Sequence, residues 1–144
     1  MMGSTHLAAG IILSAALTSN PVGILAGGVA SLLPDIDEPG SMLSRRIPVI
    51  PSLISVLGHR TITHSLLGLF LFSIPIFLFL KEYVLVFMFA YLSHLVLDTL
   101  TPMGVPWLWP VITKRFSLPV MRTGGIVEGI FVVTFLIGSY YLLR

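Results

Sequence analysis

The chain has 144 residues, the length of a single domain, with a formal net charge of +2. Hydrophobic residues make up 56% of it and charged residues 10%, whereas a soluble domain carries about 25% charged residues. Its mean hydropathy is +1.01, so the composition excludes an ordinary soluble enzyme, a disordered chain and a coiled coil. The sequence has no cysteine, which excludes disulfides, thiolate metal sites and a cysteine nucleophile. We therefore expect a polytopic helical membrane bundle, all-α in fold, with residues 1–144 as one integral membrane domain.

The first 34 residues contain no Asp, Glu, Lys or Arg, and a turn signal at Asn20-Pro21 divides them. This pattern predicts a helical hairpin over residues 6–18 and 22–33. Each arm is shorter than the roughly 20 residues of a full span, so we expect short helices in thinned bilayer or helices sheltered by others. Both arms are rich in Gly and Ala, which favours close helix–helix contact in lipid.

Three longer apolar stretches follow and predict helices at residues 61–80, 83–100 and 125–143. Pro75 predicts a kink in the first of them. Lys81 and Glu82 form a polar turn between the first and the second. The chain is thus expected to contain about five transmembrane or membrane-embedded helices.

Two longer connections, residues 38–60 and 101–124, lie on the side of the N-terminus if there are five spans. That side carries six basic residues, and the other side carries only Lys81 and Arg144. The six are Arg45, Arg46, Arg60, Lys114, Arg115 and Arg122. The positive-inside rule places this face in the cytoplasm and the chain in the inner or plasma membrane as a multi-pass protein. We expect most of these cations to anchor the chain against anionic lipid.

The same topology brings the rare ionisable residues to one end of the bundle. Five of the six acidic residues and all four histidines lie at helix ends that face this side. They are His6, Asp35, Asp37, Glu38, His59, His64, His94, Asp98 and Glu128. Ionisable groups inside membrane segments are costly and usually functional, so this convergence indicates a site.

Histidine and carboxylate ligands together suit zinc, with manganese or iron as near competitors. His94 and Asp98 are four residues apart, so they share one face of a helix. Asp35 and Asp37 can both turn inward if the segment around Pro34 is not α-helical. Clustered metal ions can activate water and stabilise both oxygens of an in-line displacement.

Each of these residues also has a structural interpretation. His94 and Asp98 could form a hydrogen-bonded pair that holds two helices together, and Asp35 could cap a polar loop. Glu128 could pair with an arginine, and Arg60 could merely follow the positive-inside rule. The cost of burying so many charges favours the site, but the alternatives remain open at this point.

Three segments carry a family resemblance. They are LPDID at residues 33–37, GHRTITHS at 58–65 and SHLVLDTLTP at 93–102. With an N-terminal histidine, this set resembles the LexA-regulated, membrane-bound metal-dependent hydrolases, the YdjM-type family, from His6 to Glu128. That family is similar to the zinc-dependent phospholipase C and single-strand nuclease superfamily, whose members are all-helical enzymes with clustered zinc ions.

The resemblance implies a divalent-metal cofactor, two or three Zn²⁺, with Mn²⁺ or Fe²⁺ as alternatives. The metal ligands it implies are His6, Asp35, His59, His64, His94 and Asp98, with Glu128 as a further candidate. Together with the composition, it leads to the hypothesis of a membrane-embedded hydrolase that cleaves a phosphoester in a lipid by a metal-activated water. Asp37 or Glu128 would take the proton of the water, and Arg60 would hold the phosphate with its planar guanidinium. The expected partner is a membrane lipid substrate, and no nucleic acid is expected.

Three other functions remain as alternatives. The same metal chemistry could cleave an amide or a carboxyl ester. A metal or proton transporter would require polar residues at several depths, whereas these gather at one end. A lipid-binding module with a structural metal would need a closed site of about four ligands, fewer than the candidates available here.

Overall fold

The computed structural model of the chain describes residues 1–46 and 60–142, and the described part is helical. Its α-helices are α1 Gly3–Leu17, α2 Pro21–Ala30, α4 Leu66–Phe79, α5 Val84–Thr99 and α6 Ile126–Leu142. Short 3₁₀ turns are η1 Leu33–Asp37, η2 Ser44–Arg46 and η4 Lys81–Tyr83. Within this part of the chain, β-structure is limited to one isolated bridge between Val105 and Phe116. The all-α prediction is therefore confirmed.

The hairpin between α1 and α2 turns at the predicted position. The Asn20 side chain accepts a hydrogen bond from the backbone N–H of Val22 at 2.9 Å, and Pro21 occupies the first helical position. Proline suits this position because its missing N–H is not needed there. α2 ends at Ala30, earlier than predicted, and the chain tightens into η1, which contains Pro34.

α4 begins at Leu66, five residues later than the prediction of a helix from residue 61. Ser65 is the N-cap: its hydroxyl accepts a hydrogen bond from the Gly68 N–H at 3.2 Å. Residues 61–65 form a bent turn instead, so His64 precedes the helix rather than lying inside it.

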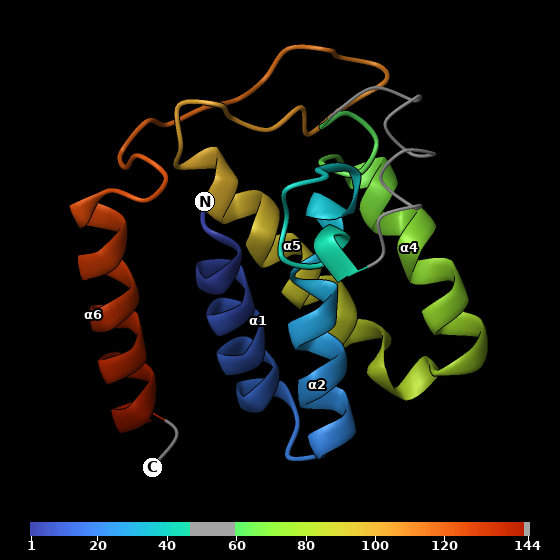
Figure 1. Cartoon of the computed structure of the whole chain (residues 1–144). Helices are drawn as coiled ribbons and strands as arrows, with labels where there is room; N and C mark the ends of the chain where they lie inside the picture. The colour runs from blue at the N-terminus through green and yellow to red at the C-terminus, as the bar shows by residue number, and fades with distance from the viewer. Residues whose placement is uncertain (47–59, 143–144) are drawn as a thin grey trace.

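α1, α2 and α5 pack against one another, and α4 packs on α5 (Figure 1). Small residues let α1 and α2 approach closely, as predicted for this hairpin. A Cβ added at Gly27 would lie 1.7 Å from Ser14 Oγ, and one at Gly10 would lie 2.4 Å from Ser31 Cβ. No larger side chain fits at these contacts without separating the helices.

The buried apolar core centres on α5. Its members come from four segments: Ala30, Leu69, Phe87, Ala90, Tyr91, Leu95 and Val105. Tyr91 is fully buried among them, and its hydroxyl donates to the Thr63 carbonyl at 2.6 Å. This bond fixes the turn before α4 against the middle of α5.

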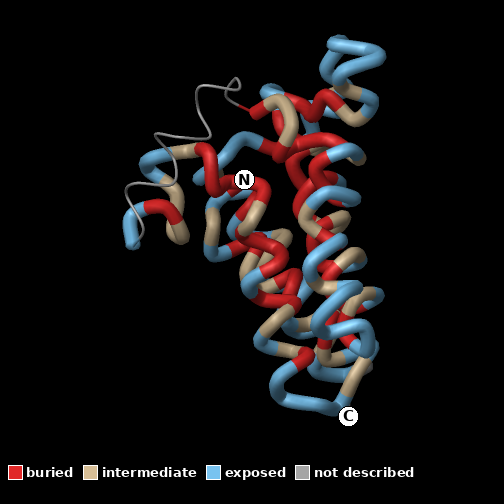
Figure 2. The backbone as a smooth tube through the Cα atoms, turned by 90° about the vertical axis from the view of Figure 1, so that its right-hand side faces the viewer, coloured by how far each residue is buried: buried red, intermediate tan, exposed pale blue. Residues whose placement is uncertain are grey.

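Long stretches of the helices are exposed (Figure 2), and many of the exposed side chains are large and apolar. Phe79 at the end of α4 is 82% exposed and Ile126 at the start of α6 is 83% exposed. Among the described residues, only the stretch Lys81–Thr99 is both long and apolar enough to cross a membrane. α1, α2, α4 and α6 are apolar but shorter, so the expected number of spans stays a prediction.

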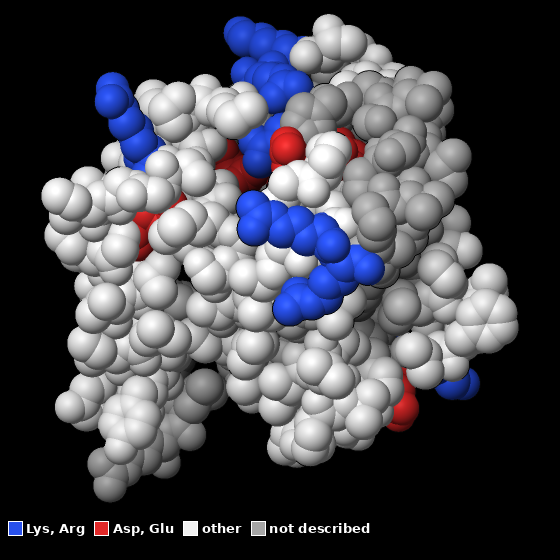
Figure 3. Space-filling view, viewed as in Figure 1, with Lys and Arg blue, Asp and Glu red and all other residues white. Residues whose placement is uncertain are grey.

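The two ends of the bundle differ in charge. In Figure 1 the N-terminus and the long connection between α5 and α6 lie at one end, and η4 lies at the other. Figure 3 shows the lysine and arginine side chains of this face mainly toward the former end and across the middle. Lys81 and Glu82 stand at the latter. The chain therefore concentrates its polar chemistry at the end where the candidate site lies.

Candidate metal centre

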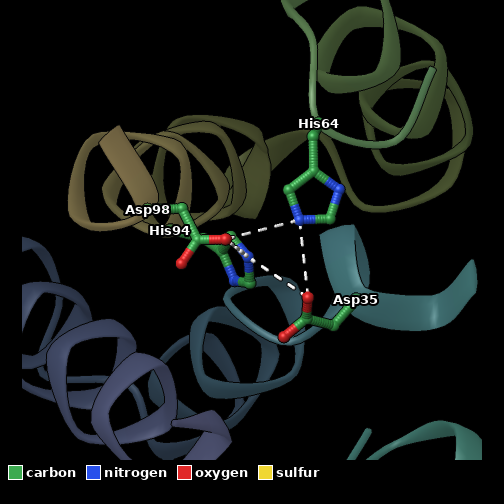
Figure 4. A group of neighbouring side chains, drawn as sticks. All are labelled: Asp35, His64, His94 and Asp98. Atoms are coloured by element: carbon green, nitrogen blue, oxygen red, sulfur yellow. Dashed lines mark ion pairs between the residues drawn. The ribbon is translucent and has the colours of Figure 1, made fainter. Parts of the chain in front are cut away.

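Four buried side chains from three segments converge near this end of the bundle. Asp35 comes from η1, His64 from the turn before α4, and His94 and Asp98 from α5 (Figure 4). Each offers one ligand atom, and these atoms all lie within 4.8 Å of one another. We call these residues the four-residue cluster.

Local structure explains why these side chains meet. His94 and Asp98 are one helical turn apart on α5, so both point to the same side. The 3₁₀ turn of η1 carries Asp35 across the end of α2. The bond from Tyr91 to the Thr63 carbonyl places His64 over the same face of α5.

The distances inside the cluster suit a shared cation better than direct pairing. His64 Nε2 lies 3.4 Å from Asp35 Oδ1 and 3.7 Å from Asp98 Oδ2. His94 Nε2 lies 3.7 Å from an oxygen of each carboxylate. Within the described part of the chain, neither Nε2 atom has a hydrogen-bond partner. Buried polar atoms without partners are costly, and a bound ion would satisfy them.

The other ring nitrogens orient the two imidazoles. His94 Nδ1 lies 2.7 Å from the Ser31 carbonyl oxygen. Because a carbonyl only accepts, Nδ1 must carry the proton, and the neutral ring then presents the Nε2 lone pair to the cluster. His64 Nδ1 lies 3.1 Å from the Thr63 hydroxyl, which can hold that ring in the same way. Two imidazole nitrogens and two carboxylate oxygens form a donor set that zinc takes readily.

Asp35 is held in the form that binds cations. Burial raises the pKa of its carboxyl group, but the contact with His64 and the nearby His94 imidazole lower it by more. The net pKa lies well below the ordinary value, so Asp35 stays ionised at neutral pH.

Arg60 lies against the cluster. Its guanidinium is 3.4 Å from Asp35 Oδ1 and 3.1 Å from Asp98 Oδ2. Its backbone N–H donates to Asp37 Oδ2 at 2.6 Å, and its φ of 53° is unusual for a residue with a side chain. The Arg60 side chain thus contacts two predicted site acids, and its backbone N–H donates to a third.

His6 lies beside the four-residue cluster and contacts both His94 and Asp98. Its ring stacks on that of His94 with 3.6 Å between centroids, and its Nε2 is 3.2 Å from Asp98 Oδ1. The Met1 amino group also contacts this oxygen. Asp98 therefore presents Oδ1 to His6 and Oδ2 to the cluster, the arrangement of a carboxylate that could bridge two ions.

Glu128 is buried but makes a different set of contacts. Its Oε1 accepts hydrogen bonds from the Met2 N–H at 2.8 Å and the Thr5 hydroxyl at 2.7 Å. Its Oε2 accepts one from the Gly124 N–H at 2.7 Å. These bonds join the start of α6 to the start of α1, and the structure does not bring Glu128 into the four-residue cluster.

The remaining predicted site residues are Asp37 and His59. Asp37 is 1% exposed and lies beside the cluster through its bond to Arg60. His59 lies outside the described residues. Tyr91 also positions the site, and its spacing of three residues before His94, which puts both on one helix face, is the sequence signal for it. The contact from the Ser31 carbonyl to His94 could not be predicted from the sequence, because every residue has a backbone carbonyl.

Comparisons with known protein families and with individual proteins point to the same family. The model of the YdjM inner membrane protein family matches residues 1–143. Inner membrane protein YdjM of Escherichia coli (strain K12) is 42% identical over 98 residues, which cover 62% of this chain and 50% of YdjM. The matched region thus spans about half the length of that relative.

Two further relatives match more of their own length. Protein YvsG of Bacillus subtilis (strain 168) is 35% identical, and the match covers 98% of this chain and 93% of YvsG. Inner membrane protein YbcI of Escherichia coli (strain K12) is 33% identical, with 80% of this chain and 70% of YbcI covered. No solved structure matches the chain.

Proposed function

Because this chain belongs to the YdjM inner membrane protein family, we propose that it is a membrane-embedded, metal-dependent hydrolase whose site holds zinc-type divalent ions. The bond it cleaves is a phosphoester in a lipid or lipid-linked substrate. The observation that carries this proposal is the four-residue cluster, in which two imidazole nitrogens and two carboxylate oxygens converge in a buried place. Both imidazole nitrogens and the Asp98 oxygen have no hydrogen-bond partner among the residues that the structure describes.

Such ions, when bound, would lower the pKa of a water molecule and polarise a phosphoryl oxygen. The cluster would hold one ion between Asp35, His64, His94 and Asp98. His6 and the second oxygen of Asp98 offer the beginning of a neighbouring position, which supports more than one ion. His59 remains a proposed ligand.

Arg60 is proposed to bind the phosphate. Its guanidinium already lies between two carboxylates, and its planar donors match the oxygens of a phosphoester. A phosphate that binds beside Asp35 and Asp98 would contact the Arg60 guanidinium without a large movement of that side chain. Arg60 would thus orient the substrate and stabilise negative charge that develops on it.

Asp37 is the better of the two proposed bases. It is buried next to Arg60, and its carboxylate stands beside the place where a phosphate would sit. Glu128 already accepts three hydrogen bonds, which reduces its capacity to take a proton. Asp37 would therefore receive the proton of the attacking water.

The same proposal assigns the site to the cytoplasmic face of the inner membrane. The basic residues of the described chain lie mainly at the end that carries the cluster, as cytoplasmic ends do. The extensive exposed apolar surface of α4 and α6 suits contact with lipid. A headgroup at this interface would lie at the level of the cluster.

Hydrolysis by purified protein tests the proposal. Detergent-solubilised protein should cleave one member of a panel of phospholipids and small phosphoesters, and removal of divalent ions should abolish the cleavage. His94→Ala and Asp98→Ala should lose at least about a hundredfold in rate, because they remove ligands of the activating ion. Glu82→Gln, which removes an acid at the opposite end, should retain the rate of the unaltered protein.

Carboxyl esters and amides belong in the same panel, because the same chemistry could act on them. Cleavage of these substrates alone would replace the phosphoester assignment. Undiminished cleavage by His94→Ala, or by protein freed of divalent ions, would contradict a metal-dependent mechanism.

A further inference from the structure

A surface pocket beside the site has an unusually basic wall. Its volume is about 490 Å³, and six residues line it: Gly3, Ser4, Gly40, Met42, Arg45 and Arg46. Both arginines are exposed. Figure 3 shows a pair of basic side chains extended across the middle of this face of the molecule.

The two arginines of this wall have no acidic partner in the described part of the chain. Among residues 1–46 and 60–142, no carboxylate forms an ion pair with Arg45 or Arg46, whereas Arg60 contacts two. Arg46 Nη1 donates to the Met42 carbonyl at 3.2 Å, which leaves its other donors available. Two guanidinium groups on one pocket attract an anion with several acceptor oxygens.

The pocket is joined to the proposed site on two sides. The Ser44 hydroxyl donates to the Ile36 carbonyl at 2.8 Å, which holds the arginine-bearing turn against η1, where Asp35 and Asp37 lie. Gly3 and Ser4 precede His6 within the first turn of α1. A ligand bound by the arginines would therefore lie beside segments that carry site residues.

We propose that Arg45 and Arg46 form a subsite for the phosphate-bearing headgroup of an anionic phospholipid, next to the four-residue cluster. This subsite rests on the proposed function, because it defines the class of lipid presented to that cluster. The ligand is a lipid rather than a free phosphate ester, because the chain belongs to a family of inner membrane proteins and its helices expose many large apolar side chains. A zwitterionic headgroup would bring a cation toward the two arginines and would bind less well.

Lipid binding tests this subsite without depending on catalysis. Purified full-length protein in a neutral detergent would be titrated with short-chain phosphatidylglycerol, short-chain phosphatidylcholine and glycerol phosphate. We expect the unaltered protein to prefer phosphatidylglycerol. Arg45→Gln with Arg46→Gln should weaken that binding at least about tenfold and leave phosphatidylcholine binding unchanged.

A matched double variant separates a specific subsite from general positive charge. Lys114→Gln with Arg122→Gln removes the same number of exposed charges from the same end and should weaken phosphatidylglycerol binding far less. Arg45→Lys with Arg46→Lys should retain a larger part of the preference than the glutamine pair, because charge is kept. Thermal unfolding of each variant confirms that it is folded.

Three results would overturn the subsite. They are an equal loss in the two glutamine pairs, an absence of preference for phosphatidylglycerol, and glycerol phosphate binding as tight as that of the lipid. Metal content measured on the same samples separates this proposal from the proposed function. A preference for phosphatidylglycerol that depends on the arginines, in protein that binds no metal, would retain the subsite and refute the hydrolase.

Discussion

At His94, a backbone carbonyl determines what the side chain can do. The Ser31 carbonyl fixes the proton on Nδ1, so Nε2 faces Asp35 and Asp98 as a potential ligand. A histidine that merely joined two helices would use both nitrogens in hydrogen bonds. Here one nitrogen is anchored and the other is left to the cluster, which favours metal binding over the structural interpretation.

Glu128 shows the opposite case, in which a predicted site residue makes contacts that suit a structural role. Glu128→Ala should destabilise the protein, because the buried Thr5 hydroxyl would lose its acceptor at a cost of about 1–3 kcal/mol and two part-buried backbone donors would lose theirs as well. Glu128→Gln keeps one acceptor oxygen and should lose less. Thermal unfolding in detergent measures both changes. An alanine variant that is as stable as the unaltered protein but fails to hydrolyse substrate would identify Glu128 as the catalytic base instead.

Much of the candidate site could be predicted from the sequence, because its residues are ionisable and lie within or beside apolar stretches. His94, Asp98 and His64 interrupt or flank apolar stretches. Because burying an ionisable side chain costs free energy, their positions in the sequence already indicate a functional site. The sequence could not show that Arg60 would bridge two carboxylates, because this depends on a backbone conformation with φ of 53°. It also could not distinguish the contacts of Glu128 from those of Asp37, since both are acids at helix ends.

At the scale of elements, the apolar stretches predicted the helices, and local capping determined where they begin and end. The late start of α4 follows from the Ser65 cap, and the early end of α2 follows from η1. These differences have consequences for the site. A helix from residue 61 would have placed His64 one turn inside α4, whereas the observed turn allows it to reach α5.

A substitution that adds one methyl group tests the close packing of α1 on α2. Gly27→Ala should lower stability by about 1–3 kcal/mol, because the new Cβ would overlap Ser14. Gly138→Ala on α6 is the matched control, since a Cβ there meets nothing within 4 Å. Alanine otherwise favours a helix, so the control should be neutral or slightly stabilised. Equal effects in thermal unfolding would show that α1 and α2 do not approach as closely as described.

At the scale of the whole molecule, charge asymmetry predicts how the chain sits in the bilayer. The sequence has no cysteine, so single cysteines can be introduced without background. We expect Glu82→Cys to react with a membrane-impermeant maleimide on intact cells. Ser41→Cys and Lys114→Cys should react only after the membrane is permeabilised, because the basic end faces the cytoplasm. Labelling of position 41 or 114 on intact cells would reverse the proposed orientation.

The bundle brings η1, the turn before α4 and the end of α5 together at its basic end, and this convergence is the basis of the proposed hydrolase. The most direct measurement is the zinc content of purified, folded protein after equilibration with zinc and removal of loosely bound ions. We predict at least one ion per chain in the unaltered protein and in Glu82→Gln, and its loss in His94→Ala and Asp98→Asn. A folded, unaltered chain that retains no zinc, or equal zinc in all four proteins, would contradict the metal centre.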